Sequence, residues 1–216
     1  MPSLRDQLEA KRRTMSDEVR RAYEAMVSEL RRTGFLDHVL RVGDRFPDLV
    51  LPNAESELVA ISALLRRGPL VVTFFRGEWC PYCRLTLDAL AAALPEFQAT
   101  GAALVAITPE TGGRAMDAKR NHHVGFEVLS DVDCGVGLSC GVVFRAPEPY
   151  RLLLLKYGTD LAERHGNPAW FLPVPATFVV DRSGIIRWRF VTVDFTERAE
   201  PAGILVALRG LAAAEA

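Results

Sequence analysis

The sequence predicts an α/β protein in which a central mixed β-sheet is flanked by helices and preceded by an N-terminal helical extension. Two observations support this fold class. In the middle of the chain, apolar runs at 69–75 and 102–108 enclose a helical pattern, as in two parallel strands joined by a crossover helix. Near the C-terminus, residues 173–191 have the pattern of two antiparallel strands joined by the tight turn 181–184.

The first element is helical. Residues 3–30 carry apolar side chains at three- and four-residue steps with charged residues between them, which predicts one long amphipathic helix. We therefore divide the chain into an N-terminal helical segment, residues 1–34, and a main domain, residues 40–216. The helix either packs on its own domain or forms a dimer contact, and packing on its own domain is the simpler interpretation.

In the main domain, the predicted elements are short, and turn residues lie between them. After a predicted β-hairpin and a short helix ended by Gly68, the run 69–75 consists of β-branched and aromatic residues, as in a strand that is buried on both faces. The predicted elements, in order, are the hairpin 48–61, the helix 61–68, the strand 69–75, the helix 84–101, the strand 102–108, the helix 113–123, the strand 126–130, the helical segment 148–164, the hairpin 173–191 and the helix 198–214.

Composition excludes several classes of protein. The chain has 26 basic and 27 acidic residues, so it lacks the broad positive field that nucleic acid binding requires. Its N-terminal residues contain no apolar signal region, and no run of eighteen apolar residues indicates a membrane span. We expect a cytoplasmic protein. Four cysteines in 216 residues are too few for a disulfide scaffold.

The segment "RGEWCPYCRLTL", residues 76–87, carries the chemistry. Cys80 and Cys83 follow a buried strand and open a helix, where unpaired amide N–H groups and the helix dipole stabilise a thiolate. Pro81 suits the first helical position because it has no N–H group to leave unpaired. Such a pair sits at the carboxyl end of a parallel strand, where open sheets place their sites. The geometry favours reversible cycling between dithiol and disulfide.

Other roles for the cysteines are less well supported. A zinc site needs a second ligand pair, but Cys134 and Cys140 are six residues apart and His122 and His123 are adjacent. Cys134 and Cys140 are either buried packing residues or have a resolving or regulatory role. No glycine-rich phosphate-binding loop is present, so we expect no cofactor.

From Arg41 to the C-terminus, the chain resembles the AhpC/TSA family of peroxiredoxin-like proteins within the thioredoxin-fold superfamily. The segments that carry the resemblance are "VGDRFPDLVLPN", "LVVTFF", "VAITPE", "VLSDVD" and "PATFVVDRSGIIR". The resemblance implies a thioredoxin-like fold and a thiol-based antioxidant oxidoreductase that reduces hydroperoxides. It does not extend to the N-terminal helical segment.

The sequence departs from the family pattern at two places. Cys83 takes the place of the peroxidatic cysteine, but Cys80 replaces the usual threonine three residues before it, and Pro175 replaces the usual arginine. The CxxC motif and Pro175 resemble thioredoxin instead, in which a cis-proline faces the disulfide. This second resemblance predicts a cis peptide bond between Val174 and Pro175.

Two mechanisms follow from these resemblances. As a peroxidase, the Cys83 thiolate attacks a hydroperoxide and Cys80 condenses with the sulfenic acid to a disulfide, which a thioredoxin-like or small-thiol reductant reduces. As a protein disulfide reductase, Cys80 attacks a substrate disulfide and Cys83 resolves the mixed disulfide. A third interpretation is a non-enzymatic redox-sensing or partner-binding module, in which the N-terminal helix forms a homodimer.

Residues around the motif complete the predicted site. Arg76 or Arg84 can replace the missing arginine of the family. Trp79 and Tyr82 are expected to shape the rim of the site and exclude water, and Tyr82 is expected to affect the redox potential of the pair.

Overall fold

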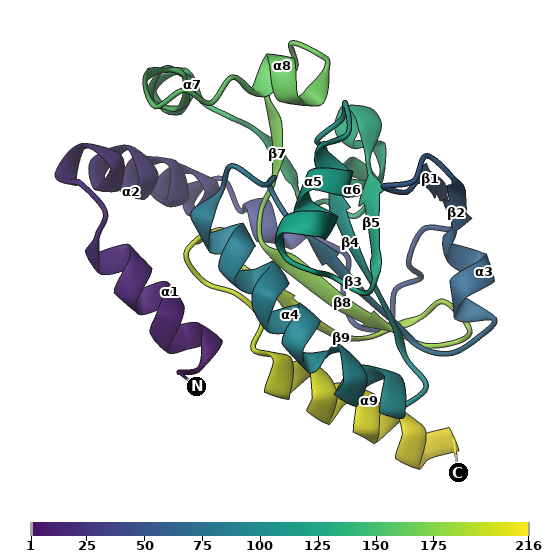
Figure 1. Ribbon diagram of the computed structural model, residues 1–216. Coiled ribbons are helices and arrows are strands. Elements are labelled where there is room, and N and C mark those ends of the chain that lie inside the picture. Colours follow the sequence, from purple (N-terminus) through teal and green to yellow (C-terminus); the bar gives the residue numbers. More distant parts are fainter. Residues whose placement is uncertain (1, 216) are drawn as a thin grey trace.

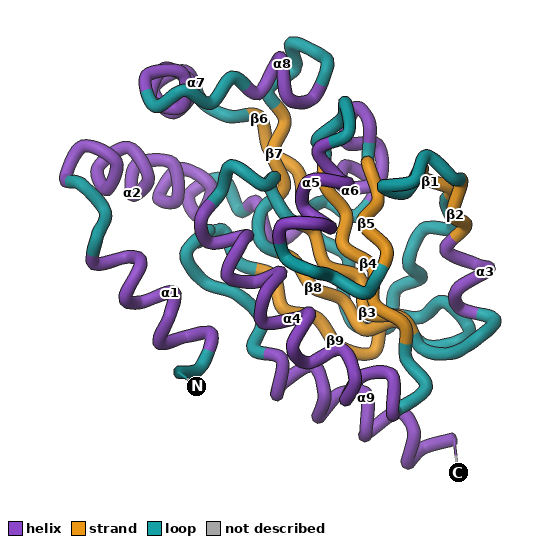
Figure 2. The backbone as a smooth tube through the Cα atoms, viewed as in Figure 1, coloured by secondary structure: helices purple, strands orange, loops and turns teal. Residues whose placement is uncertain are grey.

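The computed structural model describes residues 2–215 (Figure 1). At its centre lies a five-stranded sheet with the strand order β5-β4-β3-β8-β9 (Figure 2). These strands are β3 (Leu70–Phe74), β4 (Ala103–Thr108), β5 (Glu127–Ser130), β8 (Ala176–Val180) and β9 (Ile186–Val191). β3, β4 and β5 are parallel, while β8 is antiparallel to both β3 and β9. The predicted mixed sheet is confirmed.

Strand β3 occupies the middle of the sheet because each of its side chains is either apolar or hydrogen-bonded inside the protein. All five residues are buried, and the hydroxyl of Thr73 lies 3.0 Å from that of Thr177 on β8. A strand buried on both faces is what the continuous apolar run predicted. The cysteine motif follows the carboxyl end of β3 and therefore lies at one edge of the sheet.

Two small two-stranded sheets accompany the main sheet. β1 (Val50–Pro52) pairs with β2 (Leu58–Ala60), as predicted. β6 (Val143–Arg145) pairs with β7 (Phe171–Pro173), and this pair was not predicted. Its two strands have three residues each and are separated by two helices, so no local turn signals their pairing.

Helices cover the sheet and extend beyond it. From residue 35 onward they are α3 (Ile61–Leu65), α4 (Pro81–Ala99), α5 (Arg114–Asn121), α6 (Gly135–Ser139), α7 (Glu148–Lys156), α8 (Leu161–His165) and α9 (Pro201–Glu215), with short 3₁₀ turns at Phe35–His38 and Val132–Cys134. The predicted helical segment 148–164 is broken after Lys156, because Gly158 adopts a left-handed conformation and the Asp160 carboxylate caps a new helix. α4 and α9 run beside each other in front of the sheet (Figure 1).

The prediction of one long N-terminal helix is wrong. The segment forms two helices, α1 (Leu4–Arg13) and α2 (Asp17–Arg32). The break arises at Ser16, whose hydroxyl accepts a hydrogen bond from the Val19 N–H and so caps a second helix. α1 lies beside α4, and α2 lies beneath α7 (Figure 1).

The apolar faces of α1 and α2 are buried in the same core as the sheet. Leu4, Leu8, Tyr23 and Met26 are each at most 5% exposed, so these helices pack on their own chain. Among the described residues, no helix combines the length and the apolar character that crossing a membrane requires.

Candidate active site

The cysteine motif joins the end of β3 to the start of α4. Cys80 is the N-cap of α4 and Pro81 is its first residue, as predicted from the sequence. The loop before the motif turns at Gly77, which has a φ of 137°. A Cβ atom on Gly77 would lie 2.6 Å from both Glu110 Cδ and Trp79 Nε1, so the turn requires glycine.

Both sulfur atoms lie inside the protein as free thiols. Cys80 is 1% exposed and Cys83 is fully buried. Cys83 Sγ accepts a hydrogen bond from the backbone N–H of Arg76 and another from Arg198 Nη2, each over 3.4 Å. The pair thus lies between a helix N-terminus and two arginines, which is a setting that stabilises negative sulfur.

The surroundings separate the pKa values of the two thiols. Burial opposes ionisation of Cys80, but the hydrogen bond from Cys83 and the charges of Arg76 and Arg198 lower its pKa to about 5. Burial and the hydrogen bond to the Cys80 thiolate raise the pKa of Cys83 well above its ordinary value. Close thiols titrate as a pair, and in this pair the surroundings favour the thiolate on Cys80 over the thiolate on Cys83.

Arg76 lies beside the thiols in an aromatic cage, which is formed by the rings of Trp79, Tyr150 and Phe195. Its Cζ atom is 4.7 Å, 5.5 Å and 4.3 Å from the centroids of these rings, respectively. Arg76 is 2% exposed, and its Nη2 donates a hydrogen bond of 2.5 Å to Tyr150 Oη. Its Nε has no hydrogen-bond partner. The cage holds the cation by contact with π-faces.

A cavity of about 470 Å³ opens against Cys80, and we call it the main cavity. Its walls come from four parts of the chain: the corner between α1 and α2, the cysteine motif, α7 with the residues around it, and the loop before α9. Apolar and aromatic side chains dominate the lining, which comprises Lys11, Thr14, Met15, Ser16, Val19, Arg76, Trp79, Cys80, Pro81, Tyr82, Tyr150, Leu153, Leu154, Tyr157, Thr159 and Phe195. Cys83 does not belong to this lining, so Cys80 is the sulfur that a molecule in the main cavity meets.

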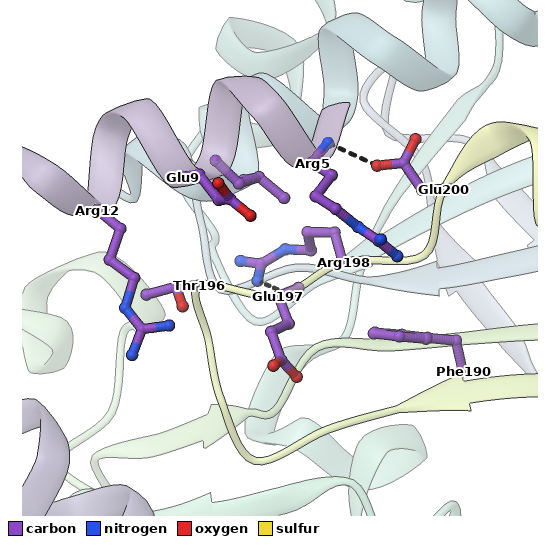
Figure 3. Close-up of a pocket in the computed structure, with 9 residues that line it drawn as sticks. Arg5, Glu9, Arg12, Phe190, Thr196, Glu197, Arg198 and Glu200 are labelled. Atoms are coloured by element: carbon purple, nitrogen blue, oxygen red, sulfur yellow. Dashed lines mark hydrogen bonds between the residues drawn. The ribbon is translucent and has the colours of Figure 1, made fainter. Parts of the chain in front are cut away.

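A second cavity, of about 450 Å³, lies on the side of Arg198 (Figure 3). Figure 3 shows Arg198 between α1 and the loop that precedes α9, with Arg5 and Glu197 close by. Arg198 Nη1 donates to the carbonyl oxygens of Phe195 and Glu197, while its Nη2 meets Cys83. Three arginines and three glutamates line this cavity, together with Leu8, Phe190 and Thr196. Arg198 is thus fixed by backbone carbonyls and directed at the buried sulfur.

Comparison with known proteins identifies the family. The sequence model of the AhpC/TSA family matches residues 42–189 of the 216. The chain belongs to the AhpC/TSA family. It is therefore a peroxiredoxin-like, thiol-dependent peroxidase, and the enzymatic interpretations are favoured over a non-enzymatic module. A comparison with curated proteins finds no match.

Solved structures of other peroxiredoxins share the fold. Peroxidoxin BcpB from Mycobacterium tuberculosis is 20% identical, with a TM-score of 0.62 over 80% of this chain and 98% of that one. Peroxiredoxin Q from Xanthomonas campestris is 20% identical, with a TM-score of 0.58 over 82% and 99%. The 2-Cys peroxiredoxin from Plasmodium vivax is 14% identical, with a TM-score of 0.63 over 82% and 84%. The predicted thioredoxin-like fold is confirmed.

Within this AhpC/TSA protein, the structure separates the two arginines that were considered as replacements. Arg76 lies against the sulfurs, in the aromatic cage. Arg84 is exposed, and its Nε lies 3.8 Å from a carboxylate oxygen of Glu78. Trp79, Pro81 and Tyr82 line the main cavity. Arg76 is therefore the arginine that the geometry places at the reactive sulfur.

The predicted cis peptide bond at Pro175 is absent, since the described residues contain none. The chain passes directly from the end of β7 at Pro173 to the start of β8 at Ala176. On the way, the Val174 N–H donates to Val142 O over 2.8 Å, and Pro175 O accepts from the Thr192 N–H over 3.1 Å. Both backbone groups are thus hydrogen-bonded without a cis bond, so this part of the thioredoxin-like pattern is not reproduced.

Three residues of the site were missed in the sequence: Tyr150, Phe195 and Arg198. They lie about 70 to 120 positions beyond the motif and reach it only through the fold. His122 was assigned no role, but its ring nitrogens lie 2.6 Å from Asp88 Oδ1 and 3.0 Å from Glu78 Oε2. It therefore ties the motif loop to α4.

The other two cysteines are poor nucleophiles. Cys134 and Cys140 are buried, and burial with the nearby Asp131 charge raises the pKa of each to about 12. Reactivity requires the thiolate, so the structure supports packing roles for both. In the part of the chain that the structure describes, no group of three or more His, Cys, Asp or Glu side chains could hold a metal ion.

Proposed function

We propose that Cys80 and Cys83 carry out the peroxidase reaction, with Cys80 as the sulfur that attacks the hydroperoxide. The observation that carries this assignment is the position of Cys80: it lines the main cavity, whereas Cys83 is fully buried. The lowered pKa of Cys80 supports the same assignment. It reverses the order that the family pattern predicted, and attack by Cys83 is the alternative.

The reaction balances with these two thiols. The Cys80 thiolate attacks one oxygen of the hydroperoxide, the O–O bond breaks, and the alcohol leaves after taking up a proton. Cys80 is now a sulfenic acid, and Cys83 attacks its sulfur, so that water leaves and the disulfide forms. The two thiols lose two electrons, and the peroxide gains them. An external thiol then reduces the disulfide.

Two cations assist the transfer of charge to oxygen. Arg76 and Arg198 both lower the pKa of Cys80, and they favour the thiolate before attack. Arg76 also lines the main cavity with an Nε–H that has no partner. In the proposed mechanism this N–H donates to the oxygen that becomes negative as the O–O bond breaks, in place of the arginine that the family pattern lacks.

The partners of the reaction follow from the same proposal. The oxidant is a hydroperoxide that enters the main cavity, and the reductant is a thioredoxin-like protein or a small thiol. A homodimer and a cytoplasmic location are also part of the proposal. In the second candidate function, the same Cys80 thiolate attacks a protein disulfide, which its position in the main cavity also favours.

Single-turnover oxidation tests the assignment. Reduced wild type, Cys80→Ser and Cys83→Ser proteins are mixed with hydrogen peroxide or an organic hydroperoxide in a stopped-flow instrument, and a sulfenic acid probe is then added. We expect Cys83→Ser to react at the wild-type rate and to trap a sulfenic acid at Cys80, while Cys80→Ser loses the fast phase. Fast oxidation of Cys80→Ser at Cys83 would overturn this assignment and support attack by Cys83.

A disulfide substrate separates the two candidate functions. Insulin replaces the peroxide in the same experiment, again with wild type and both serine variants. If peroxide reacts no faster than with a free thiol while Cys83→Ser traps a mixed disulfide through Cys80, the protein acts as a disulfide reductase. If insulin reacts slowly and peroxide reacts quickly, the peroxidase is the physiological activity.

A further inference from the structure

Arg76 is a buried cation without a carboxylate partner. Thirteen ion pairs join described residues within 4.0 Å, and none of them includes Arg76. Its neighbours are the aromatic cage, Tyr150 Oη and the two sulfurs. Cys80 lines the same cavity as Arg76, and the Arg76 backbone N–H donates to Cys83 Sγ, so a thiolate of this pair is the anion that can balance the charge of Arg76.

Oxidation removes that balancing charge. When Cys80 and Cys83 form a disulfide, neither sulfur is negative, and Arg76 keeps its positive charge because a guanidinium does not lose its proton in proteins. A buried charge without a partner is costly, although the aromatic faces and Tyr150 offset part of the cost. This cost is smaller for Arg198, since its side chain is partly exposed and donates to two backbone carbonyls. The reduced form is thus stabilised relative to the disulfide.

We propose that the Cys80–Cys83 disulfide is strongly oxidising because of Arg76, and that the protein has a second activity as a disulfide donor to cysteine pairs in flexible, apolar polypeptide segments. A disulfide whose reduced form is stabilised has a high reduction potential. This inference rests on the proposed function only in that the two cysteines form a disulfide. The hydroperoxide that regenerates the disulfide is the oxidant of the established activity.

The transfer proceeds by two exchanges of sulfur. A thiolate of the partner attacks Cys80, the bond between Cys80 and Cys83 breaks, and Cys83 leaves and takes up a proton. The second partner thiol then attacks the partner's sulfur in the mixed disulfide, and Cys80 leaves as a thiolate. The partner loses two electrons and two protons, and the enzyme pair gains two electrons. Thiols of low pKa leave most readily, which favours the release of Cys80.

The shape of the main cavity selects the class of partner. Cys80 is 1% exposed and lies inside a cavity of about 470 Å³, so a cysteine in a flexible segment reaches it more readily than one on the rigid surface of a folded protein. An unfolded or flexible segment can enter. The lining includes Met15, Val19 and Leu154, which favours a segment with apolar side chains beside its cysteine.

Equilibration with glutathione tests the redox part of the proposal. Wild type, Arg76→Met, Arg76→Lys and Arg84→Met are incubated in buffers of varied glutathione ratio, trapped by alkylation and quantified by mass spectrometry. We expect Arg76→Met to shift the equilibrium at least tenfold toward the disulfide, which corresponds to about 30 mV. Arg76→Lys keeps the charge and should recover most of the wild-type value. Arg84→Met removes an exposed charge from the first turn of α4, next to Cys83, and should leave the equilibrium unchanged.

The outcomes separate this proposal from the proposed function. An Arg76→Met equilibrium within twofold of wild type overturns the role of Arg76 and leaves the peroxidase cycle intact. If no buffer yields a disulfide between Cys80 and Cys83, both proposals are wrong. Methionine suits an aromatic cage, and circular dichroism checks that the variant is folded. If Arg76→Met is not folded, Arg76→Gln replaces it, because glutamine also removes the positive charge but keeps a polar side chain.

Transfer to a substrate tests the donor activity without peroxide. Oxidised protein is mixed with reduced, unfolded ribonuclease A, and the free thiols of the ribonuclease are counted. We expect about one disulfide to form in ribonuclease for each oxidised enzyme molecule, and a mixed disulfide through Cys80 to accumulate when the ribonuclease is replaced by a single-cysteine peptide. Absence of transfer from a fully oxidised enzyme would show that it is not a disulfide donor.

Discussion

The side chain of Arg198 reaches Cys83 from a loop 115 residues further along the chain and donates a hydrogen bond to its sulfur over 3.4 Å. Cys83 in turn donates to the Cys80 thiolate, so the cation acts on the nucleophile both directly and through its neighbour. Together with Arg76, it places two positive charges around two cysteines. This arrangement explains how an AhpC/TSA protein that lacks the usual threonine and arginine still holds a reactive thiolate.

Replacement of Arg198 is expected to raise the pKa of Cys80. In Arg198→Met the thiolate loses one of the two nearby cations, and the midpoint of thiol alkylation by iodoacetamide should move from about pH 5 to a higher pH. Arg209→Met is the matched control, because Arg209 is an exposed arginine on α9 that lies near Glu96. An unchanged alkylation profile in Arg198→Met would show that Arg76 and the helix N-terminus suffice.

The stability of the reduced protein should depend on pH through Cys80. Its folded-state pKa of about 5 lies below the ordinary value of 9.0, so the thiolate stabilises the folded state fully near pH 9, and this contribution is lost as pH falls to 5. The slope has an upper limit of about 1.4 kcal/mol per pH unit. Urea denaturation of reduced wild type and Cys80→Ser between pH 5 and 8 measures the difference. Parallel curves for the two proteins would contradict the lowered pKa.

The sequence predicted the framework of the site better than its chemistry. The buried run 69–75 and the motif after it indicated a central strand that ends at a helix N-terminus, and both are confirmed. That inference used only neighbours along the chain. The aromatic cage joins Trp79 to Tyr150 and Phe195, and no periodicity links residues so far apart.

The errors in the sequence-based prediction arise from individual hydrogen bonds that the residue pattern does not show. A serine cap at Ser16 divides the N-terminal helix, although the apolar spacing continues across the break. The backbone around Pro175 is fixed by hydrogen bonds with Val142 and Thr192, which lie next to β6 and β9. Analogy with thioredoxin could not reveal these partners.

The division into residues 1–34 and 40–216 stays a prediction, as does the dimer.

Removal of the Tyr150 hydroxyl should destabilise the protein while it leaves the aromatic cage in place. In Tyr150→Phe the ring is kept, but Arg76 Nη2 loses its 2.5 Å acceptor inside the protein. An unsatisfied buried donor costs about 1 to 3 kcal/mol, and urea denaturation should show a loss of this size. Tyr157→Phe removes a hydroxyl from an exposed tyrosine bonded to Glu18 and should change stability little. Equal effects in the two variants would argue against a special role for Tyr150.

Gly77→Ala should disrupt the loop that positions the motif. A Cβ atom at this position would lie 2.6 Å from Glu110 Cδ and Trp79 Nε1, and the φ of 137° is unfavourable for alanine. We expect a loss of about 1 to 3 kcal/mol in unfolding free energy and a slower reaction of Cys80 with iodoacetamide, because Trp79 must move away from Arg76. Gly210→Ala, on α9 with no atom near its added methyl group, should be neutral or stabilising. If Gly77→Ala kept wild-type stability and reactivity, the loop would be free to rearrange, and the position of Arg76 beside the sulfurs would not depend on its turn.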